Sequence, residues 1–177
     1  TIDFMFIGYI CKKNNINNIY FIIKDSITKV PIVGDCMGDD ISLKRNWEED
    51  KENLIKQLNE IESGMIIIYP EGTRFDVDKY KKSKKFCYDN KLPILNYTLT
   101  PRVKGTHAIC KTLFEKNRLG NIYDTTLYFK DHSKTNLYLS KIFTMSDLGE
   151  LDINIKKFGF SEEDIDYEVF KNKMYDP

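Results

Sequence analysis

The chain has 177 residues, of which 41% are hydrophobic and 31% are charged, a composition that favours one folded domain over a disordered chain. Its 27 basic and 27 acidic residues cancel, so no overall charge argues for binding to nucleic acid. The four cysteines lack the paired spacing of a zinc or redox site, and no apolar run reaches the roughly 20 residues of a membrane span.

The first half of the chain alternates between helical and strand-like segments. An amphipathic run predicts a helix over residues 2–13, and a short apolar run predicts a central strand over residues 19–23. Pro31 and two glycines then predict a short helix and a turn before a strand near residues 40–44. Apolar residues at helical spacing predict a helix over 47–63, and a strand is expected over 65–69.

The second half continues the alternation. Its expected elements are a helix over 78–90, a strand near 96–100, a helix over 106–117, strands over 124–130 and 136–144, and a capped helix over 162–173. Strands that alternate with helices predict an α/β fold. We expect a single domain over residues 1–177.

The most informative segment is Tyr-Pro-Glu-Gly-Thr-Arg-Phe, residues 69–75, directly after a predicted buried strand. Gly72 allows positive φ and close approach of a ligand, and Arg74 offers a rigid fork of donors suited to phosphate. Ligands of open α/β sheets usually bind at strand ends. An ordinary polar turn with Arg74 in a surface ion pair explains the same residues about equally well.

Three further segments carry a recognisable pattern in a fixed order. They are Lys24-Asp25-Ser26 with Val30-Pro31-Ile32-Val33-Gly34, then Ile41-Ser42-Leu43-Lys44-Arg45-Asn46-Trp47, and finally Leu92-Pro93 to Thr100-Pro101-Arg102-Val103-Lys104-Gly105. Together with residues 69–75, they resemble the motifs of the glycerolipid acyltransferases, in the eukaryotic-type lysophosphatidate and lysocardiolipin acyltransferase branch. The resemblance covers residues 1 to about 130, and residues 131–177 are expected to complete the domain.

This resemblance implies transfer of a fatty acyl group from acyl-CoA to the hydroxyl of a lysophospholipid such as 1-acylglycerol-3-phosphate. It implies an α/β domain with a mixed central β-sheet flanked by helices, and no metal and no cofactor beyond the co-substrate acyl-CoA. The residues expected to bind the acceptor phosphate are Arg45, Glu71, Gly72, Thr73 and Arg74. Glu71 has two alternative roles, positioning the acceptor or pairing with one of the arginines.

Three more basic residues match basic positions of the family. Lys24, Arg102 and Lys104 are candidates for contacts with the acceptor phosphate or with CoA. The alternatives are a solvated lysine for Lys24 and a helix-capping role for the other two. The residues alone do not rank these possibilities.

The catalytic pair of the family is a His-x-x-x-x-Asp motif, in which His is the general base and Asp orients it. Asp3 matches the aspartate, and its partner would fall three residues before Thr1. His107 and His132 lie in no matching motif and are expected to be structural or surface residues. We therefore expect a chain that begins inside its domain; the alternative is an inactive remnant of the family that binds lipid or acyl-CoA.

A membrane surface is the expected environment, because the implied substrates are lipids. The resemblance implies an intracellular, endoplasmic-reticulum-like membrane and its cytosolic side. Trp47 and the lysine-rich run over residues 79–85 are candidates for docking on anionic lipid, and a solvated helix face is the alternative interpretation of that run.

Overall fold

The computed structural model describes residues 3–29, 40–44, 46–130 and 150–175. They form two compact units: Thr1–Asn17 with Gly120–Phe160, which we call the hairpin unit, and Asn18–Leu119 with Ser161–Pro177, which we call the sheet unit. The α/β class predicted from the sequence is confirmed, because both units combine helices with strands. The single-domain boundary stays a prediction.

The sheet unit is built on three parallel strands, β1 (Ile19–Lys24), β2 (Ile41–Leu43) and β3 (Met65–Ile67). Their order is β2-β1-β3, with Ile22 level with Ile41 and Ile19 level with Met65. All three carboxyl ends therefore point to one edge of the sheet. In open α/β sheets, that edge is where ligands bind.

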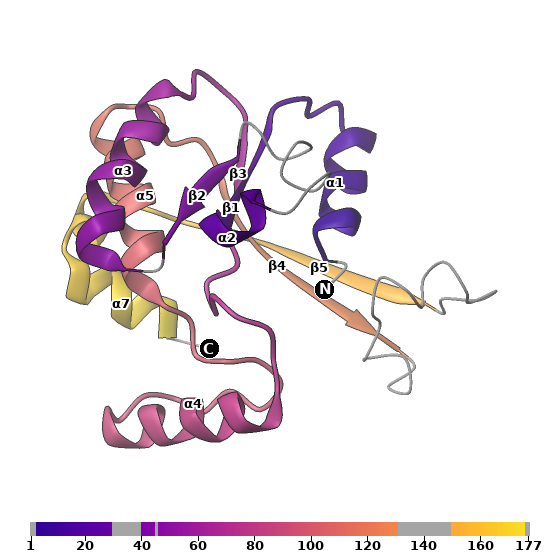
Figure 1. Cartoon of the computed structure of the whole chain (residues 1–177), viewed down its shortest axis with the longest axis vertical. Helices are drawn as coiled ribbons and strands as arrows, with labels where there is room; N and C mark the ends of the chain where they lie inside the picture. Colours follow the sequence, from indigo (N-terminus) through magenta and orange to yellow (C-terminus); the bar gives the residue numbers. More distant parts are fainter. Residues whose placement is uncertain (1–2, 30–39, 45, 131–149, 176–177) are drawn as a thin grey trace. The chain divides into compact units, whose positions relative to one another are not determined.

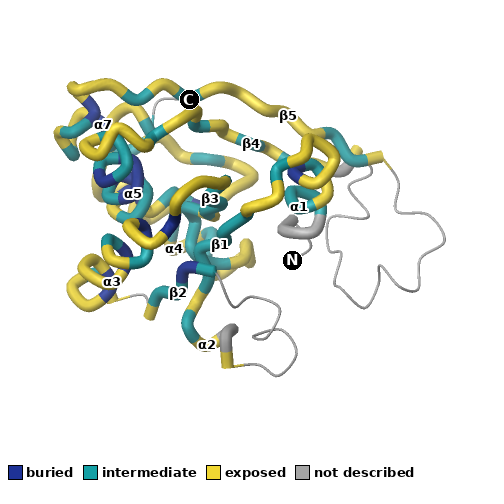
Figure 2. Tube along the Cα trace, turned by 90° about the horizontal axis from the view of Figure 1, so that it is seen from above, coloured by how far each residue is buried: buried dark blue, intermediate teal, exposed yellow. Residues whose placement is uncertain are grey.

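Helices of the sheet unit are α2 (Asp25–Thr28), α3 (Trp47–Glu60), α4 (Val77–Asp89), α5 (Val103–Glu115), the 3₁₀ helix η3 (Glu162–Ile165) and α7 (Tyr167–Tyr175). Figure 1 shows α3 and α5 side by side, with α4 below the sheet. The core lies between α3, α5 and one sheet face, where buried side chains of both helices (Figure 2) meet alternate residues of β1, of β3 and of the segment directly after β3. These residues are Leu54, Leu58, Ile109, Tyr20, Ile22, Ile66 and Ile68.

Helix α3 also satisfies backbone groups of β2, which has a strand neighbour on one side only. The Lys44 amide donates to Asp50 Oδ1 at 2.7 Å, and the Ser42 amide donates to Gln57 Oε1 at 3.3 Å. Asp50 is 4% exposed, so it is a buried carboxylate that accepts a backbone donor. These bonds hold the end of β2, and hence the start of the segment that leads to Arg45, against α3.

A glycine makes the close approach of β3 to β1 possible. Gly64 has φ +145°, and a Cβ at this position would lie 2.6 Å from the Asn18 carbonyl oxygen. The same carbonyl accepts a hydrogen bond from the Met65 amide at 2.8 Å. Gly64 therefore permits the backbone contact that begins β3.

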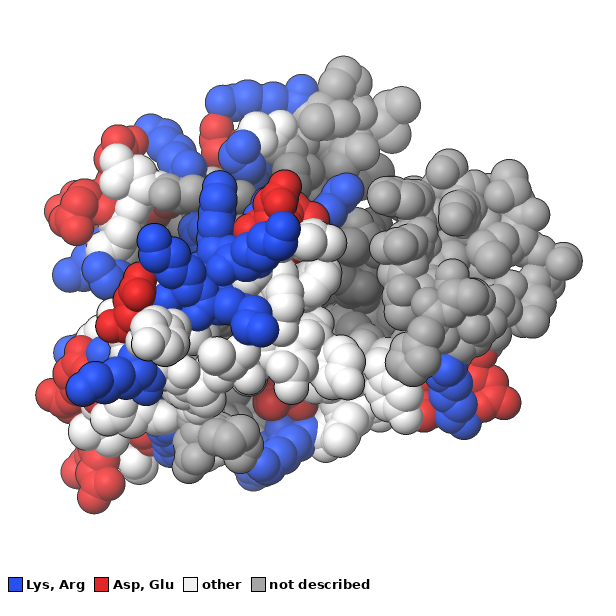
Figure 3. Space-filling model, turned by 90° about the horizontal axis from the view of Figure 1, so that it is seen from below, with Lys and Arg blue, Asp and Glu red and all other residues white. Residues whose placement is uncertain are grey.

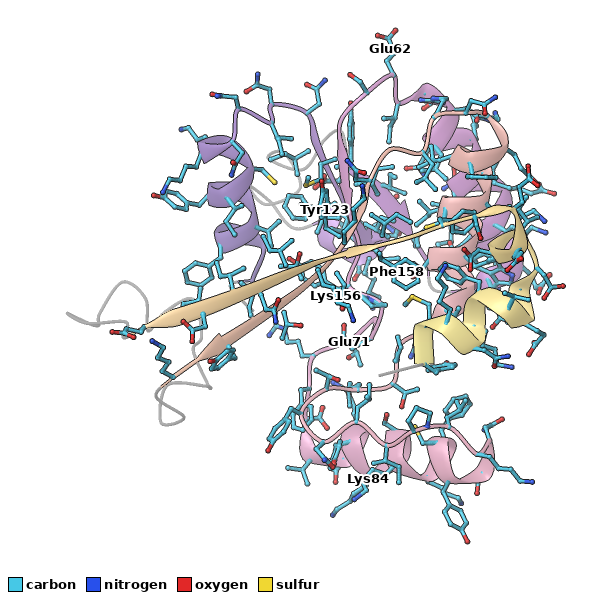
Figure 4. All side chains as sticks on the ribbon, turned by 180° about the vertical axis from the view of Figure 1, so that it is seen from behind. Glu62, Glu71, Lys84, Tyr123, Lys156 and Phe158 are labelled. Carbon is cyan, nitrogen blue, oxygen red and sulfur yellow. The ribbon has the colours of Figure 1, made fainter. Side chains whose placement is uncertain are left out.

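The hairpin unit contains α1 (Asp3–Lys13) and the antiparallel strands β4 (Ile122–Phe129) and β5 (Leu151–Phe158). Their register runs from Ile122 opposite Phe158 to Phe129 opposite Leu151. Figure 4 labels Tyr123, Lys156 and Phe158 on this pair of strands. The antiparallel pairing of the molecule thus lies here, and the parallel pairing lies in the sheet unit.

Two predicted strands need comment. Residues 96–100 form no strand, because the Thr100 amide bonds to the Ser83 hydroxyl at 2.9 Å instead of to another strand. The strand expected over 136–144 lies outside the described residues. Strand β5 was missed, since Ile153 and Ile155 are exposed and the strand is defined by pairing with β4 more than by burial.

Candidate functional site

The candidate site lies at the carboxyl-end edge of the parallel sheet. Lys24 is the last residue of β1 and is exposed. Phe21 is level with Ile67 across the sheet, so Lys24 and Pro70, each three residues further on, leave the sheet at the same level. Lys24 and the turn that begins at Pro70 therefore lie at the same edge of the sheet.

The turn after β3 is tight and depends on Gly72. Its amide donates to the Tyr69 carbonyl at 3.0 Å, and its φ is +65°. This is the left-handed region that L-residues with a side chain rarely adopt. A Cβ at Gly72 would lie 3.3 Å from Cδ and 3.5 Å from Nε of Arg102. The missing side chain thus leaves room for the stem and guanidinium of that arginine.

Arg102 is brought to this turn by three separate attachments of its own segment. The Arg102 amide donates to the Pro70 carbonyl at 2.7 Å. Immediately before it, the Pro101 carbonyl accepts from the Tyr175 hydroxyl of α7 at 3.0 Å. The Thr100 hydroxyl lies 2.6 Å from the hydroxyl of Ser83 in α4. Two motifs about thirty residues apart are joined in this way into one structural unit.

Most charged groups at this edge are cations, and these cations are exposed to solvent. Arg74, Arg102 and Lys104 are exposed, and none forms an ion pair with a carboxylate among the residues the structure describes. Lys104 lies in the first turn of α5, which carries no acidic residue. Unpaired guanidinium groups beside a helix N-terminus are suited to binding a phosphate.

Glu71, Gly72 and Thr73 are half-buried in the segment that joins β3 to α4. Figure 4 labels Glu71 on this segment. Since its neighbours Pro70 and Gly72 contact the Arg102 segment, Glu71 stands within the same turn. The structure therefore brings the turn around Gly72 together with Arg102, an association that the linear sequence does not show.

Two predicted residues cannot be placed in this geometry. Arg45 lies outside the described residues, although the preceding Lys44 is held by Asp50. Asp3 begins α1 in the hairpin unit, and its side chain is not among those described. Their roles stay predictions.

Sequence reasoning missed three residues whose hydrogen bonds hold the backbone next to predicted site residues in place. Asp50, Ser83 and Tyr175 each bond to a backbone or hydroxyl group within two residues of a predicted site residue. For Asp50 and Ser83, the sequence offered only a weak indication of such a role. Asp50 is one acid among three in a helical first turn, and Ser83 interrupts a run of lysines.

His107 has a structural role. It is 9% exposed, and its Nε2 lies 3.2 Å from the carbonyl oxygen of Asp164 and 3.0 Å from that of Ile165. Two carbonyl acceptors imply that Nε2 carries the proton. The ring also packs edge-on against Tyr167 at 5.4 Å between centroids. His107 therefore ties α5 to η3 and α7, while His132 lies outside the described residues.

The cysteines among the described residues are Cys11, Cys87 and Cys110, and all three are buried. Burial raises the pKa of Cys110 to about 12, and the negative charge of Asp164 acts in the same direction. A thiol with this pKa is neutral at physiological pH and is a poor nucleophile.

Comparison with known proteins gives the family. A family model described as Acyltransferase matches residues 1–110. The chain is 29% identical over 157 residues to the probable 1-acyl-sn-glycerol-3-phosphate acyltransferase 5 of Arabidopsis thaliana, covering 85% of this chain and 40% of that protein. It is 31% identical over 120 residues to the human 1-acyl-sn-glycerol-3-phosphate acyltransferase gamma, covering 64% and 31% of the two chains.

A further relative is an uncharacterized acyltransferase of Schizosaccharomyces pombe, 25% identical over 189 residues, with 98% of this chain and 53% of that protein covered. The chain thus spans about a third to a half of the length of these relatives. No solved structure matches it. The family model covers more than half of the chain and includes the turn after β3 and Arg102. The chain therefore belongs to the glycerolipid acyltransferase family.

Proposed function

We propose that this protein transfers a fatty acyl group from acyl-CoA to the free hydroxyl of a lysophospholipid such as 1-acylglycerol-3-phosphate. The observation that carries the proposal is the joining of residues 69–74 to Arg102 through Pro70 and Gly72. This places unpaired cations at the carboxyl-end edge of the sheet. The names of the relatives from Arabidopsis and human add the substrate class.

In the proposed step, the acceptor hydroxyl oxygen attacks the thioester carbonyl carbon directly. A general base takes the hydroxyl proton, the carbon–sulfur bond breaks, and CoA leaves as a thiolate that recovers the proton. We assign to Asp3 the orientation of the histidine base of the family motif, which the 177 residues do not contain. The step needs no acyl-enzyme, no metal and no further cofactor.

The cationic residues supply positioning. An arginine that holds the acceptor phosphate fixes the reacting hydroxyl near the base and turns a bimolecular encounter into an intramolecular one. We assign binding of the acceptor phosphate to a first group of residues, most of them in the turn after β3. We assign to a second group of cations the binding of either this phosphate or CoA. The first group is Arg45, Glu71, Gly72, Thr73 and Arg74; the second is Lys24, Arg102 and Lys104.

The proposed substrates also define where the protein works. Lysophospholipids and acyl-CoA partition into membranes, so we propose action at an intracellular membrane, on the cytosolic side of an endoplasmic-reticulum-like compartment. Among the described helices, none combines the length and apolar character required to cross a bilayer.

The test is a comparison of Arg74→Ala with Arg74→Lys in acylation and binding assays of an upstream-extended form of the protein that carries the motif histidine. Loss of a charge-assisted hydrogen bond of about 1.5–3 kcal/mol should raise the KM for 1-acylglycerol-3-phosphate roughly 10- to 100-fold. The lysine variant should recover part of this loss, because it keeps the charge but not the fork. Lys56→Ala, on the exposed side of α3, is the control.

A monoacylglycerol, which lacks the phosphate, serves as the second acceptor. Its KM and its Kd by calorimetry should not change in Arg74→Ala. Equal effects on both acceptors would contradict a phosphate-anchoring role. Binding of 1-acylglycerol-3-phosphate and acyl-CoA without any turnover by this extended form would identify the inactive binding remnant instead of an enzyme.

A further inference from the structure

Helix α4 carries an outward stripe that the proposed chemistry does not use. Val77, Lys81, Lys84 and Tyr88 follow at intervals of four, three and four residues, so they share one side of the helix. Val77 is 65% exposed and Tyr88 is 80% exposed. Apolar side chains thus stand at both ends of a stripe whose middle is cationic.

Another side of α4 is attached to the segment before α5, which fixes the helix within the sheet unit and sets the direction of the stripe. Cys87 is buried, and its Sγ lies 2.9 Å from the Thr100 hydroxyl, which also contacts Ser83. Figure 4 shows Lys84 on the side of α4 that faces away from this attachment. The stripe is therefore a surface of the folded unit and cannot turn inward without breaking these contacts.

Positive charge is concentrated on this helix although the whole chain is neutral. Residues 77–89 hold five lysines and two aspartates, a net charge of +3, against a net charge of zero for the chain. Lys79 pairs with the N-cap Asp76 at 2.7 Å. Among the described residues, no carboxylate pairs with the other four, which are Lys81, Lys82, Lys84 and Lys85. Figure 3, seen from below and hence from the side of α4, shows Lys and Arg side chains gathered on one part of this face.

Aromatic side chains border the cationic face. Before the helix, Phe75 is 51% exposed and packs on Tyr80 at 5.3 Å, with Lys84 Nζ 5.4 Å from the Tyr80 ring centre. After it, Tyr97 is 90% exposed and Ile94 is 44% exposed. On a helix face that contacts only water, exposed aromatic rings bring no stabilisation, and such exposed apolar surface marks interaction sites. Lysines interleaved with aromatic and aliphatic side chains are typical of surfaces at the lipid headgroup level.

We propose that α4 and the following residues 92–97 lie on the surface of a bilayer that contains anionic phospholipids. The lysines bind lipid phosphates, and Val77, Tyr88 and Tyr97 enter the headgroup region. Arg74 lies two residues before the N-cap Asp76, so docking brings the turn after β3 to the level of the headgroups. This last consequence rests on the proposed function, whereas the docking itself does not.

The first test measures sedimentation with vesicles of phosphatidylcholine alone and with a share of phosphatidylserine. The protein should bind only the anionic vesicles, and the binding should weaken with added salt, since screening shortens the range of the attraction. The variant with Lys81, Lys82, Lys84 and Lys85 all changed to Gln should bind at least about 100-fold more weakly. The matched control changes four exposed lysines elsewhere to Gln: Lys51, Lys56, Lys156 and Lys157.

The second test removes the apolar contribution. Tyr88→Ser combined with Tyr97→Ser should weaken binding to anionic vesicles about tenfold and leave its salt dependence unchanged, because binding also scales with buried apolar area. Both positions are exposed, so the thermal unfolding midpoint should stay at the value of the unchanged protein. A fluorescent label at Tyr88→Cys should report a less polar environment on anionic vesicles.

Equal loss in the lysine variant and its control, or equal binding to neutral and anionic vesicles, would overturn the proposal. Binding to an RNA oligonucleotide with no binding to vesicles would also overturn it. The outcome is independent of the proposed reaction. An upstream-extended form with the motif histidine that docks but acylates nothing refutes the function alone, and one that acylates a short-chain soluble acceptor but does not dock refutes the docking alone.

Discussion

Gly72 determines how closely the turn after β3 and Arg102 approach each other. Its φ of +65° and the 3.3 Å from its virtual Cβ to Arg102 Cδ are two separate reasons for a glycine. The first is local, because a side chain strains this backbone conformation. The second is tertiary, because a side chain displaces the guanidinium stem. Substitution at this single position therefore tests backbone strain and site geometry together.

Gly72→Ala should lower the free energy of unfolding by about 1–2 kcal/mol, the cost of a left-handed conformation for an L-residue. It should also raise the KM for the acceptor, since Arg102 must move by a few tenths of an ångström or more. Urea unfolding and the acylation assay measure the two effects. The control is Gly105→Ala in α5, which meets no atom within 4 Å and should stabilise the helix by roughly 0.5–1 kcal/mol.

Arg102→Ala separates the two effects of this substitution. If only backbone strain matters, the loss of stability in Gly72→Ala persists on the Arg102→Ala background and the KM changes add. If the displaced guanidinium matters, the KM change of Gly72→Ala disappears on that background. A full KM effect that persists without Arg102 would contradict the contact as its cause.

Residue types at the site were predictable from the sequence, but their association was not. The glycine of the Pro-Glu-Gly-Thr-Arg turn was expected to allow close approach, and the structure shows that it accommodates Arg102. The bond from the Arg102 amide to the Pro70 carbonyl spans more than thirty residues, and no local pattern specifies such a bond. The role of Tyr175 was equally hidden, because it comes from the other end of the chain.

At the scale of elements, α5 is held in place by its own buried histidine. His107 connects α5 to the carbonyl oxygens of Asp164 and Ile165, and its ring lies 5.3 Å from that of Phe170, which is fully buried. The N-terminus of the same helix presents Arg102 and Lys104. The C-terminal segment therefore supports the position of the site cations through α5.

His107→Ala should lower the free energy of unfolding by about 2–4 kcal/mol, because it opens a cavity and leaves two buried carbonyls without their donor. Urea unfolding followed by circular dichroism measures the change. His107→Gln keeps a donor and should recover part of it. The KM for the acceptor should rise more than kcat falls, since a positioning helix is loosened and no reacting group is removed. A selective loss of kcat with unchanged stability would contradict this role.

The elements themselves were predicted where burial dictates the pattern. Helix α3 shows Leu54 and Leu58 at 0% exposure, and its apolar spacing was visible in the sequence. The predicted helix ran three residues too far, because Ile61 already has an extended backbone and packs into the core beside β3. Strand β5 failed the same reasoning, since its alternating isoleucines are exposed and only its register with β4 defines it.

At the scale of the whole molecule, the fold lowers the pKa of three carboxylates among the residues that the structure describes. Hydrogen bonds from Lys29 and from Lys79 lower the pKa of Asp25 and of Asp76, respectively. Burial opposes ionisation of Asp164, but hydrogen bonds from Lys173 and Ser161 outweigh it and lower this pKa as well. All three shifts have the same sign, so below the ordinary value of 3.8 the unfolded chain binds more protons than the folded one.

The expected result is an acid-labile fold. A carboxyl with a lowered pKa contributes stability that is fully present above its unfolded pKa and is lost as pH falls through its folded pKa. The free energy of unfolding should therefore be level above about pH 5 and fall steeply below about pH 4. Asp164 dominates, because it is 1% exposed and connects Ser161 at 2.7 Å with Lys173 at 2.7 Å, which joins η3 to α7.

Asp164→Asn isolates this contribution. At neutral pH the variant should be less stable by about 1–3 kcal/mol, since a charge-assisted pair and an amide acceptor are weakened together. Its stability should also fall less steeply on acidification, because one group that took up a proton on unfolding is gone. Urea unfolding at several pH values between about 3 and 7 measures both effects. The control is Glu163→Gln, an exposed neighbour in η3, which should change stability by less than about 0.5 kcal/mol. An unchanged acid slope in Asp164→Asn would show that the loss of stability arises from the general positive charge of the protonated chain, and that the attachment of the C-terminal segment does not depend on pH.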